Sequence, residues 1–356
     1  MAKAKKKTKR VLAIGNEVVV KAALAAGATA FFGYPITPAT EIIGLWPKWQ
    51  PKYKTQFLQT EDEPSAGFTL IGAVLAGAKS FTATAGPGTV LMQDAFSMAE
   101  AMRIPTVAVI VQRGGPSTGT VIYSQQEVLL TCFGGNGEGF RVVYSPSNLQ
   151  ELYDLVIQSF NTAWQYRFPT FVLTDGYLGK MRGLVEIYDP KQKRMKIVKS
   201  EPILLNPKKP KGQYINMRNC YSLEEEVFKI SEDIRRDFQK YRPKIEKWQD
   251  HKTKGAEILI VAHGIVGAAA KMAVDQLREE GIGVGLFRPV TLQPFPEKAI
   301  NQAAKGVKKI FVIESSTVQF IKIVKEALYG LTTPIKHYGR PALGITAEEI
   351  VHLIKK

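Results

Sequence analysis

Short apolar segments alternate with longer helix-compatible segments through the first half of the chain. The apolar segments are rich in β-branched or aromatic residues and are bounded by Gly, Pro or polar residues, which is typical of buried strands. These segments are VLAI (11–14), ATAFF (28–32), SFTAT (80–84), TVAVIVQ (106–112) and TFVLT (170–174). The segments between them predict helices over 16–26, 64–77, 88–102 and 148–166. Alternating strands and helices predict an α/β fold in which helices cover both faces of a parallel sheet.

Residues 186–254 depart from this alternation. This region is rich in Lys and Arg, and it holds one charged helix candidate, SLEEEVFKISEDIRRDFQKY. Its prolines are Pro190, Pro202, Pro207, Pro210 and Pro243. We interpret it as a long connection that wraps over a surface and links two domains. The alternation resumes with EILIVAHG, IGVGLF and KKIFVIES, which predict strands, and with helices near 266–280, 297–305, 316–329 and 346–355.

The order of segments predicts four regions: a basic, disordered tail (1–10), a first α/β domain (11–185), the connection (186–254) and a second, smaller α/β domain (255–356). The formal net charge is +16, and six of the Lys and Arg residues lie within residues 1–10. A basic nucleic-acid-binding protein is the alternative interpretation of this charge. The tail carries no aromatic residue on which a base could stack, so we expect no nucleic acid partner.

Cysteine content and hydropathy exclude several classes of protein. Two cysteines, Cys132 and Cys220, are too few for a disulfide framework or for an iron–sulfur cluster held by this chain alone. No run approaches the ~18–20 apolar residues of a membrane-spanning helix, so we expect no membrane association. Gly15, Asn16 and Glu17 interrupt the apolar residues after the basic N-terminus, unlike a secretory signal. We expect a reducing, cytoplasmic location.

Four loops combine Gly or Pro with a hydroxyl or a charge, and each follows a predicted strand. They are GYPITPAT (33–40), EDEPSAG (61–67), TAGPGT (84–89) and RGGPSTG (113–119). In open parallel sheets, ligands bind beyond the carboxyl ends of the strands. Four such loops in one sheet therefore indicate a ligand site at that edge.

Single residues in these loops suggest particular chemistry, and each has a structural alternative. Pro64 suits the first helical position and places Glu63 at the N-cap or the mouth of a helix, where plain capping is the alternative role. Arg113 could grip a carboxylate in a bidentate manner or form an internal salt bridge. Thr37 could bind a substrate oxygen or stabilise its own turn. Gly86-Pro87-Gly88 could bring a helix N-terminus close to an anion.

The order YPITPAT, EDEPSAG, TATAGPG, QRGGPSTG and NGEG resembles the α subunit of the 2-oxoacid:ferredoxin oxidoreductases. The resemblance is greatest to the 2-oxoglutarate and branched-chain members, which keep this subunit separate. The later segments AHG, RPVTLQPFP and FVIESS resemble the transketolase C-terminal-like domain of the same subunits. The implied fold is a doubly wound parallel sheet of the thiamine-diphosphate pyrimidine-binding type at 11–185, followed by a transketolase C-terminal-like α/β domain at 255–356.

The resemblance implies half of an active site. In this family thiamine diphosphate lies between two subunits, and the α subunit brings the pyrimidine side. A β subunit brings the diphosphate–Mg²⁺ site and a 4Fe-4S cluster, and small γ- and δ-type subunits and ferredoxin complete the partners. The chain lacks the GDG-and-Asn signature of the diphosphate site, as an α subunit should, and we expect it to hold no metal itself. The implied reaction is CoA-dependent oxidative decarboxylation of a 2-oxoacid, or its reverse.

The resemblance also assigns residues. Glu63 matches the catalytic glutamate that hydrogen-bonds N1′ of the cofactor's aminopyrimidine. The remaining matched positions line the same cleft. On the substrate side these are Ile36, Thr37, Arg113 and Ile122, and on the cofactor side Tyr34, Pro35, Gly86, Pro87 and Gly88.

One position departs from the family pattern. RGGPSTG commonly continues Leu-Pro-Thr, whereas here Thr120 and Val121 precede Ile122, so that an apolar side chain replaces a hydroxyl. Either Tyr123 or Ser124 holds the far end of the substrate, or the preferred acid is less polar than 2-oxoglutarate. The ATEI continuation after YPITP and the GGNGEG segment favour 2-oxoglutarate, with branched-chain oxoacids or pyruvate as alternatives. A transketolase-like transferase remains a further alternative.

Overall fold

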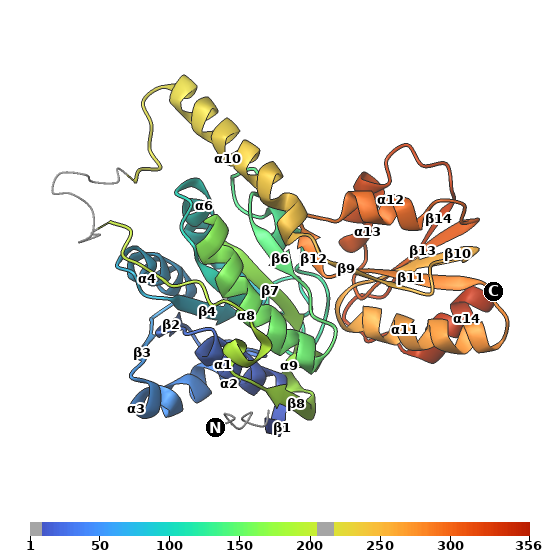
Figure 1. The fold of residues 1–356 in the computed structure, drawn as a ribbon, viewed down its shortest axis with the longest axis horizontal. Helices are drawn as coiled ribbons and strands as arrows, with labels where there is room; N and C mark the ends of the chain where they lie inside the picture. The colour runs from blue at the N-terminus through green and yellow to red at the C-terminus, as the bar shows by residue number, and fades with distance from the viewer. Residues whose placement is uncertain (1–8, 205–216) are drawn as a thin grey trace, which may run out of the picture.

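A seven-stranded sheet forms the framework of the first half of the chain (Figure 1). The computed structural model describes residues 9–204 and 217–356. The strand order is β12-β6-β7-β5-β4-β2-β3, and every neighbouring pair is parallel except β12–β6. The strands are β2 (Ala30–Gly33), β3 (Gln56–Gln59), β4 (Ser80–Thr84), β5 (Val107–Gln112), β6 (Val142–Tyr144), β7 (Thr170–Asp175) and β12 (Thr291–Gln293). The predicted parallel α/β sheet is therefore confirmed.

Helices cover both faces of this sheet because its strands are apolar on both sides. In β5, Val107, Val109 and Val111 face one core, and Ala108 and Ile110 face the other. The first core is closed by α1 (Gly15–Ala25) and α8 (Leu149–Tyr166), and the opposite face carries α4 (Glu63–Leu75) and α6 (Gln93–Ala101). Shorter helices connect these elements: α2 (Thr40–Leu45), α3 (Gln50–Tyr53), α5 (Pro87–Leu91), α7 (Val128–Phe133) and α9 (Gly176–Lys180).

A second sheet, of order β14-β13-β10-β11-β9, forms the C-terminal unit. Its strands are β9 (Trp248–His251), β10 (Ile258–Val261), β11 (Val284–Pro289), β13 (Lys309–Glu314) and β14 (Ile335–Gly339), and only β9 runs antiparallel to its neighbour. Its helices are α11 (Gly264–Glu279), α12 (Glu297–Ala303), α13 (Phe320–Ala327) and α14 (Ala347–Lys355). α11 and α14 pack on one face, and α12 and α13 pack on the other.

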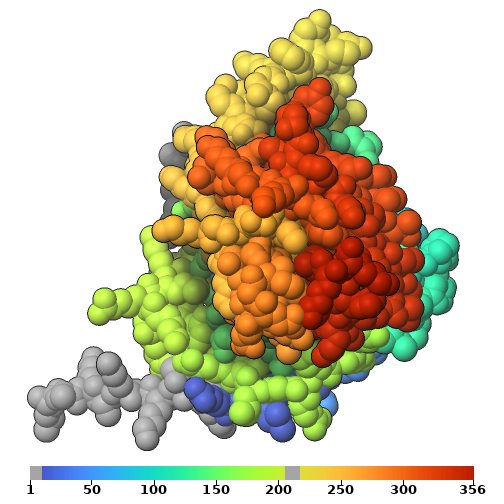
Figure 2. All heavy atoms as spheres, turned by 90° about the vertical axis from the view of Figure 1, so that its right-hand side faces the viewer, coloured from blue at the N-terminus to red at the C-terminus, as the bar shows by residue number. Residues whose placement is uncertain are grey.

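The two units share a hydrophobic core. Residues of β5 and β7 belong to the same buried cluster as residues of the second sheet, namely Ala108, Ile110, Phe171, Leu173, Leu259, Val261, Phe287 and Val312. In addition, β12 comes from the C-terminal half but pairs with β6 of the first sheet. Figure 2 shows the C-terminal unit, in orange and red, covering this end of the molecule. Because the core is continuous, the C-terminal unit is held by packing and not only by the connection.

A strand does form over the predicted residues 11–14, but the predictions that it is buried and that it belongs to the parallel sheet are wrong. β1 (Lys9–Ile14) pairs antiparallel with β8 (Arg182–Ile187) in a separate two-stranded sheet, and Leu12 is 62% exposed. A four-residue apolar run carries no information about its partner, which here lies about 170 residues away in sequence. β1 includes the last two residues of the predicted tail, whereas residues 1–8 lie outside the described part.

The predicted helices are confirmed with small changes in their bounds. The helix predicted at 88–102 is divided into α5 and α6 at Met92. The charged helix of the connection is α10 (Glu224–Ile245), which packs through Ile234, Phe238 and Ile245. Its first turns run away from the body, and Phe228 is 69% exposed (Figure 1). Residues 205–216 of the connection, with Pro207 and Pro210, lie outside the described residues. No helix within 9–204 or 217–356 is long and apolar enough to span a membrane.

Candidate functional site

Four loops meet at the carboxyl edge of the large sheet because their strands are neighbours. The loops follow β2, β3, β4 and β5, and the order β5-β4-β2-β3 places the ends of these parallel strands side by side. Ligands of open parallel sheets bind at this edge. The four loops that the sequence predicted to share one edge of the sheet therefore do lie side by side, and their contacts decide which side chains come together.

Glu63 lies at this edge without serving as a helix cap. The N-cap of α4 is Asp62, whose carboxylate accepts a hydrogen bond from the Ser65 backbone N–H at 2.7 Å. Glu63 is the first helical residue and Pro64 the second, so Glu63 lies at the mouth of the helix and the alternative role of plain capping is wrong. The Glu63 residue is only 7% exposed, and its carboxylate makes no hydrogen bond or ion pair within the described residues. A buried carboxylate without an internal donor is costly and is typical of a group that meets a ligand.

Gly88 provides the space in front of this carboxylate. A Cβ atom on Gly88 would lie 2.8 Å from Glu63 Oε1 and 2.1 Å from Thr84 Oγ1, which real contacts do not allow. The Thr84 hydroxyl is itself buried and has no hydrogen-bond partner in the described structure. α5 begins at the neighbouring Pro87. Two polar groups that lack partners therefore converge on a position that only glycine can occupy.

Arg113 joins two of the predicted loops. Its Nη1 donates to the Thr37 backbone oxygen at 2.8 Å. A Cβ atom on Gly86, whose φ is +52°, would lie 2.6 Å from Arg113 Nε. Nε itself has no hydrogen-bond partner among the described residues, although it is buried. The guanidinium is thus fixed at one nitrogen and retains a donor for a ligand, and it does not form the internal salt bridge considered as an alternative.

Glu127 is a central residue of the site that the sequence did not reveal. Its Oε1 accepts hydrogen bonds from the backbone N–H of Gly86 at 2.8 Å and of Arg113 at 3.0 Å. Burial raises the pKa of Glu127, while the Thr89 hydroxyl, these two amides and the Arg113 charge oppose that rise. An acidic residue before the apolar helix α7 looks like an ordinary cap, and no motif distinguishes it. Its contacts are with residues 14 and 41 positions away.

The remaining predicted residues lie on the rim. Tyr34 is exposed, Pro35 and Ile36 are half-buried, and all three follow β2 directly. Ile122 is 59% exposed. A Cβ atom on Gly176 would lie 1.4 Å from the Ile122 backbone oxygen and 3.1 Å from Pro38, so this glycine lets Ile122 approach the YPITP loop.

Neither hydroxyl suggested as a replacement at Ile122 is open to a ligand. The Ser124 hydroxyl is buried and lies 2.9 Å from the acceptor Gln126 Oε1 and 3.3 Å from the Ser315 backbone oxygen. Tyr123 is also buried, and its ring stacks on Tyr177 with centroids 4.1 Å apart. The apolar Ile122 side chain therefore remains the exposed group at this position.

Asp175 is a third buried carboxylate at the same edge, after Glu63 and Glu127. It ends β7 and accepts a hydrogen bond from the Leu178 backbone N–H at 2.9 Å, which caps α9. Burial raises the pKa of Asp175 to about 7. This group therefore titrates near neutrality inside the fold. The stacked Tyr123 is close by, and burial and the Asp175 charge both raise its pKa.

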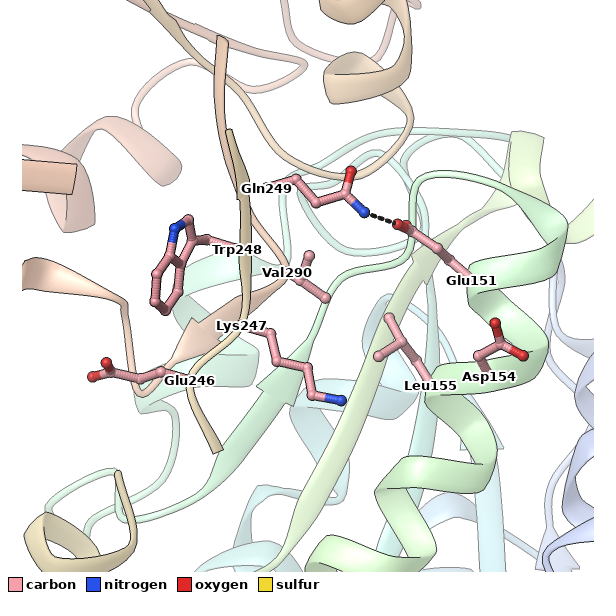
Figure 3. A pocket seen from close by; sticks show the side chains of 8 residues that line it. All are labelled: Glu151, Asp154, Leu155, Glu246, Lys247, Trp248, Gln249 and Val290. Carbon is pink, nitrogen blue, oxygen red and sulfur yellow. Dashed lines mark hydrogen bonds between the residues drawn. The ribbon is translucent and has the colours of Figure 1, made fainter. Parts of the chain in front are cut away.

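A cavity of about 390 Å³ at the junction of the two units contains none of the predicted residues (Figure 3). It lies between α8 and the residues around β9, with Lys247 and Val290 on its wall. Its Glu151 Oε1 already accepts hydrogen bonds from Gln249 at 2.8 Å and from Arg288 at 2.5 Å. This carboxylate is therefore used to hold the units together.

Two family models match successive parts of the chain. The model described as "Pyruvate flavodoxin/ferredoxin oxidoreductase, thiamine diP-bdg" matches residues 21–250. The model described as "Pyruvate:ferredoxin oxidoreductase core domain II" matches residues 256–344. The first model spans all strands of the large sheet except β12, with all four loops, and the second spans most of the C-terminal unit.

Two relatives indicate related but different substrates. The "2-oxoglutarate synthase subunit KorA" of Methanocaldococcus jannaschii is 35% identical over 327 residues, with 86% of this chain and 88% of the relative covered. The "Ketoisovalerate oxidoreductase subunit VorB" of Methanothermobacter marburgensis is 33% identical over 318 residues, with 88% of both chains covered.

Two solved structures share the fold. The 2-oxoglutarate:ferredoxin oxidoreductase from Magnetococcus marinus, solved with 2-oxoglutarate, coenzyme A and succinyl-CoA bound, has a TM-score of 0.89 and 26% identity. The match covers all of this chain and 66% of that longer chain. A split-gene transketolase has a TM-score of 0.59 at 14% identity, which shows likeness of fold alone.

Replacement of Gly88 by alanine tests the space in front of Glu63. We expect Gly88→Ala to lower the free energy of unfolding by about 1–3 kcal/mol, because the new methyl group must displace Thr84 or Glu63. Gly72→Ala is the control, because Gly72 lies in α4 with nothing within 4 Å and alanine favours a helix. Urea unfolding of both variants provides the measurement. Equal stability of the two variants would contradict the close contact of a Gly88 methyl group with Thr84 and Glu63.

The pH dependence of stability tests the burial of Asp175. Because its pKa is higher in the folded chain, its contribution to stability is full near pH 4 and is lost as the pH rises toward 7. Asp175→Asn keeps an acceptor for Leu178 and removes this titration. We expect the variant to gain about 2–3 kcal/mol over the wild type between pH 5 and pH 8, measured by urea unfolding. A constant difference across this range would show that Asp175 titrates normally.

Proposed function

We propose that this chain, which belongs to the 2-oxoacid:ferredoxin oxidoreductase family as an alpha-type subunit, forms the pyrimidine side of a thiamine diphosphate site shared with a partner subunit. In the proposed reaction a 2-oxoacid is oxidatively decarboxylated to an acyl-CoA, or the reverse, with electrons exchanged with ferredoxin. The observation that carries the proposal is the Glu63 carboxylate, which is buried, has no partner in the described structure and faces the space kept open by Gly88.

The residues at the sheet edge fit an aminopyrimidine. A ring nitrogen bearing hydrogen needs an acceptor, and the Glu63 carboxylate has no competing internal donor. Gly86 and Gly88 keep side chains away from the approach of a ring. Thiamine diphosphate would supply the carbon nucleophile and the electron sink for decarboxylation. Glu63 would hold or share the proton at N1′, which is general acid–base assistance.

The substrate carboxylate would bind at Arg113. One nitrogen of the guanidinium is used on the Thr37 backbone, and this contact orients the group. Nη2 has no hydrogen bond in the described structure and would donate a charge-assisted hydrogen bond to a carboxylate. The Thr37 hydroxyl is exposed next to this position, and Ile122 offers an apolar surface toward the far end of the substrate.

The surface around Glu63 fits a protein partner. Large apolar side chains are exposed on the elements that surround it, namely Tyr34, Leu58, Phe68, Val90 and Leu91. Such clusters mark interaction surfaces. We infer that a β subunit docks here with the diphosphate–Mg²⁺ site and a 4Fe-4S cluster. Small γ- and δ-type subunits and ferredoxin complete the proposed cytoplasmic assembly, and the net charge of +16 would favour acidic partners.

2-Oxoglutarate is the favoured substrate, with a branched-chain oxoacid as the second candidate. The KorA relative and the Magnetococcus enzyme are both named for 2-oxoglutarate. The VorB relative is almost as similar, and the exposed apolar Ile122 suits a branched chain. These two features favour different substrates, so an assay must choose between them.

A substrate comparison in the assembled complex tests the proposal. We expect the chain, purified together with its partner subunits, to reduce ferredoxin with 2-oxoglutarate and CoA at a higher kcat/KM than with pyruvate or branched-chain oxoacids. Omission of CoA provides the blank. Preference for a branched-chain oxoacid would overturn the 2-oxoglutarate assignment. Absence of activity with all 2-oxoacids would overturn the proposed function.

Substitution of Glu63 tests the carboxylate directly. We expect Glu63→Gln to lower turnover about 100-fold or more, because an amide cannot exchange the proton at N1′. Glu61→Gln is the matched control, since Glu61 lies two residues earlier and is exposed. Size-exclusion chromatography checks that both variants assemble. Turnover of the Glu63 variant close to that of the Glu61 variant would remove Glu63 from the mechanism.

A further inference from the structure

The segment that follows the Arg113 loop is tied to the C-terminal unit by a buried side chain, that of Gln125. We call residues 113–122 the substrate loop, and it ends three residues before Gln125. The Gln125 backbone N–H donates to the Ser315 oxygen at 2.9 Å, and the Ser315 N–H donates to Gln125 Oε1 at 3.0 Å. Gln125 Nε2 donates to the His263 backbone oxygen at 3.1 Å. Both ends of the side-chain amide therefore bind backbone groups of the C-terminal unit.

The two residues after Gln125 hold the beginning of the substrate loop. Gln126 Oε1 accepts a hydrogen bond from the Gly115 backbone N–H at 3.2 Å. Glu127 Oε1 accepts one from the Arg113 backbone N–H at 3.0 Å. Three consecutive side chains thus act together. Gln125 is hydrogen-bonded to the C-terminal unit, and Gln126 and Glu127 are hydrogen-bonded to the start of the substrate loop, at Gly115 and Arg113.

A second contact supports the same loop from the C-terminal unit. Ser315 Oγ lies 2.6 Å from the Leu343 backbone oxygen and 3.2 Å from that of Arg340, so it fixes the segment 340–344. Ala342 of this segment packs on the loop, because a Cβ atom on Gly114 would lie 3.2 Å from the Ala342 Cβ. Ser315 therefore connects Gln125 to a surface against which the substrate loop rests.

We propose that Gln125 is a positioning residue, which fixes the substrate loop on the C-terminal unit and thereby holds Arg113 in the orientation that binds the substrate carboxylate. The proposal rests on the proposed function for the role of Arg113. It gives the C-terminal unit a task in substrate binding, although that unit contributes no predicted substrate-binding or cofactor-binding side chain.

The chemistry of the contact suits a permanent anchor. Gln125 and Ser315 are almost fully buried, and the bonds of Gln125 are to uncharged backbone groups. Burial lowers the pKa of the adjacent His263 to about 3, so this side chain stays neutral at physiological pH. Loss of the amide would leave the Ser315 backbone N–H unpaired and would remove one of the two donors to the His263 oxygen, which also accepts from the Gly267 N–H at 2.9 Å. The anchor is therefore insensitive to pH near neutrality but sensitive to the shape of one side chain.

The test compares Gln125→Ala with Gln319→Ala in the assembled complex. Gln319 also crosses the junction, where its Oε1 accepts a hydrogen bond from the Leu129 N–H at 3.1 Å, but it holds α7 and not the substrate loop. We expect Gln125→Ala to raise the KM for the 2-oxoacid about tenfold, with the KM for CoA unchanged and Gln319→Ala within twofold of the wild type. The proposal would be overturned if the two variants lowered stability equally and Gln125→Ala left the KM for the 2-oxoacid unchanged.

A second variant and a second measurement keep the proposal testable if activity or folding fails. Gln125→Glu preserves size and the acceptor for Ser315 but sets a second carboxylate oxygen against the His263 oxygen in place of the donor, and we expect a rise in KM with this variant as well. Hydrogen exchange does not depend on the reaction: the amides of Gly114, Gly115 and Thr120 should exchange at least tenfold faster in either Gln125 variant than in Gln319→Ala. Unchanged exchange would overturn the anchor. If the wild-type complex is inactive but the loop amides exchange faster in the Gln125 variants, the proposed function alone is overturned.

Discussion

The buried carboxylate of Glu127 is the contact on which the geometry of the sheet edge depends. One of its oxygens accepts hydrogen bonds from the backbone of Gly86 and of Arg113, so it fixes the loop after β4 against the loop after β5. The parallel order of the strands brings these loops near each other, but strand order alone leaves their distance variable. The Gly86 oxygen then accepts the Thr89 N–H at the start of α5, and Arg113 holds the Thr37 backbone.

At this edge, the groups that hold the fold together are different from the groups that remain available to a ligand. Asp62 caps α4, which leaves the adjacent Glu63 carboxylate unused by the fold. Arg113 binds Thr37 through one nitrogen and keeps another free. Glycines at 86, 88 and 176 permit approaches that any side chain would block. Burial of these polar groups without partners lowers the stability of the fold, and a ligand or a partner subunit would supply the missing contacts.

The C-terminal unit acts on the site through packing and backbone contacts. Its sheet shares one hydrophobic core with the large sheet, and β12 extends that sheet directly. Ser315 and the segment 340–344 lie behind the loop that carries Arg113. A site that depends on both units, and whose open face carries exposed apolar side chains, is consistent with one part of a larger assembly.

The sequence by itself determined the elements and motifs whose signals are local. Apolar runs located β2, β4, β5 and β7, and the Gly- and Pro-rich segments after them located the edge at which Glu63, Gly88 and Arg113 meet. Only the tertiary structure decided the pairing of β1 with β8, the addition of β12 to the first sheet, and the roles of Glu127 and Gln125. The reason is physical: an isolated glutamate or glutamine, or a strand of three to six residues, carries no local signal of its partner. Those partners lie between 14 and about 190 residues away, and the packed core alone brings them together.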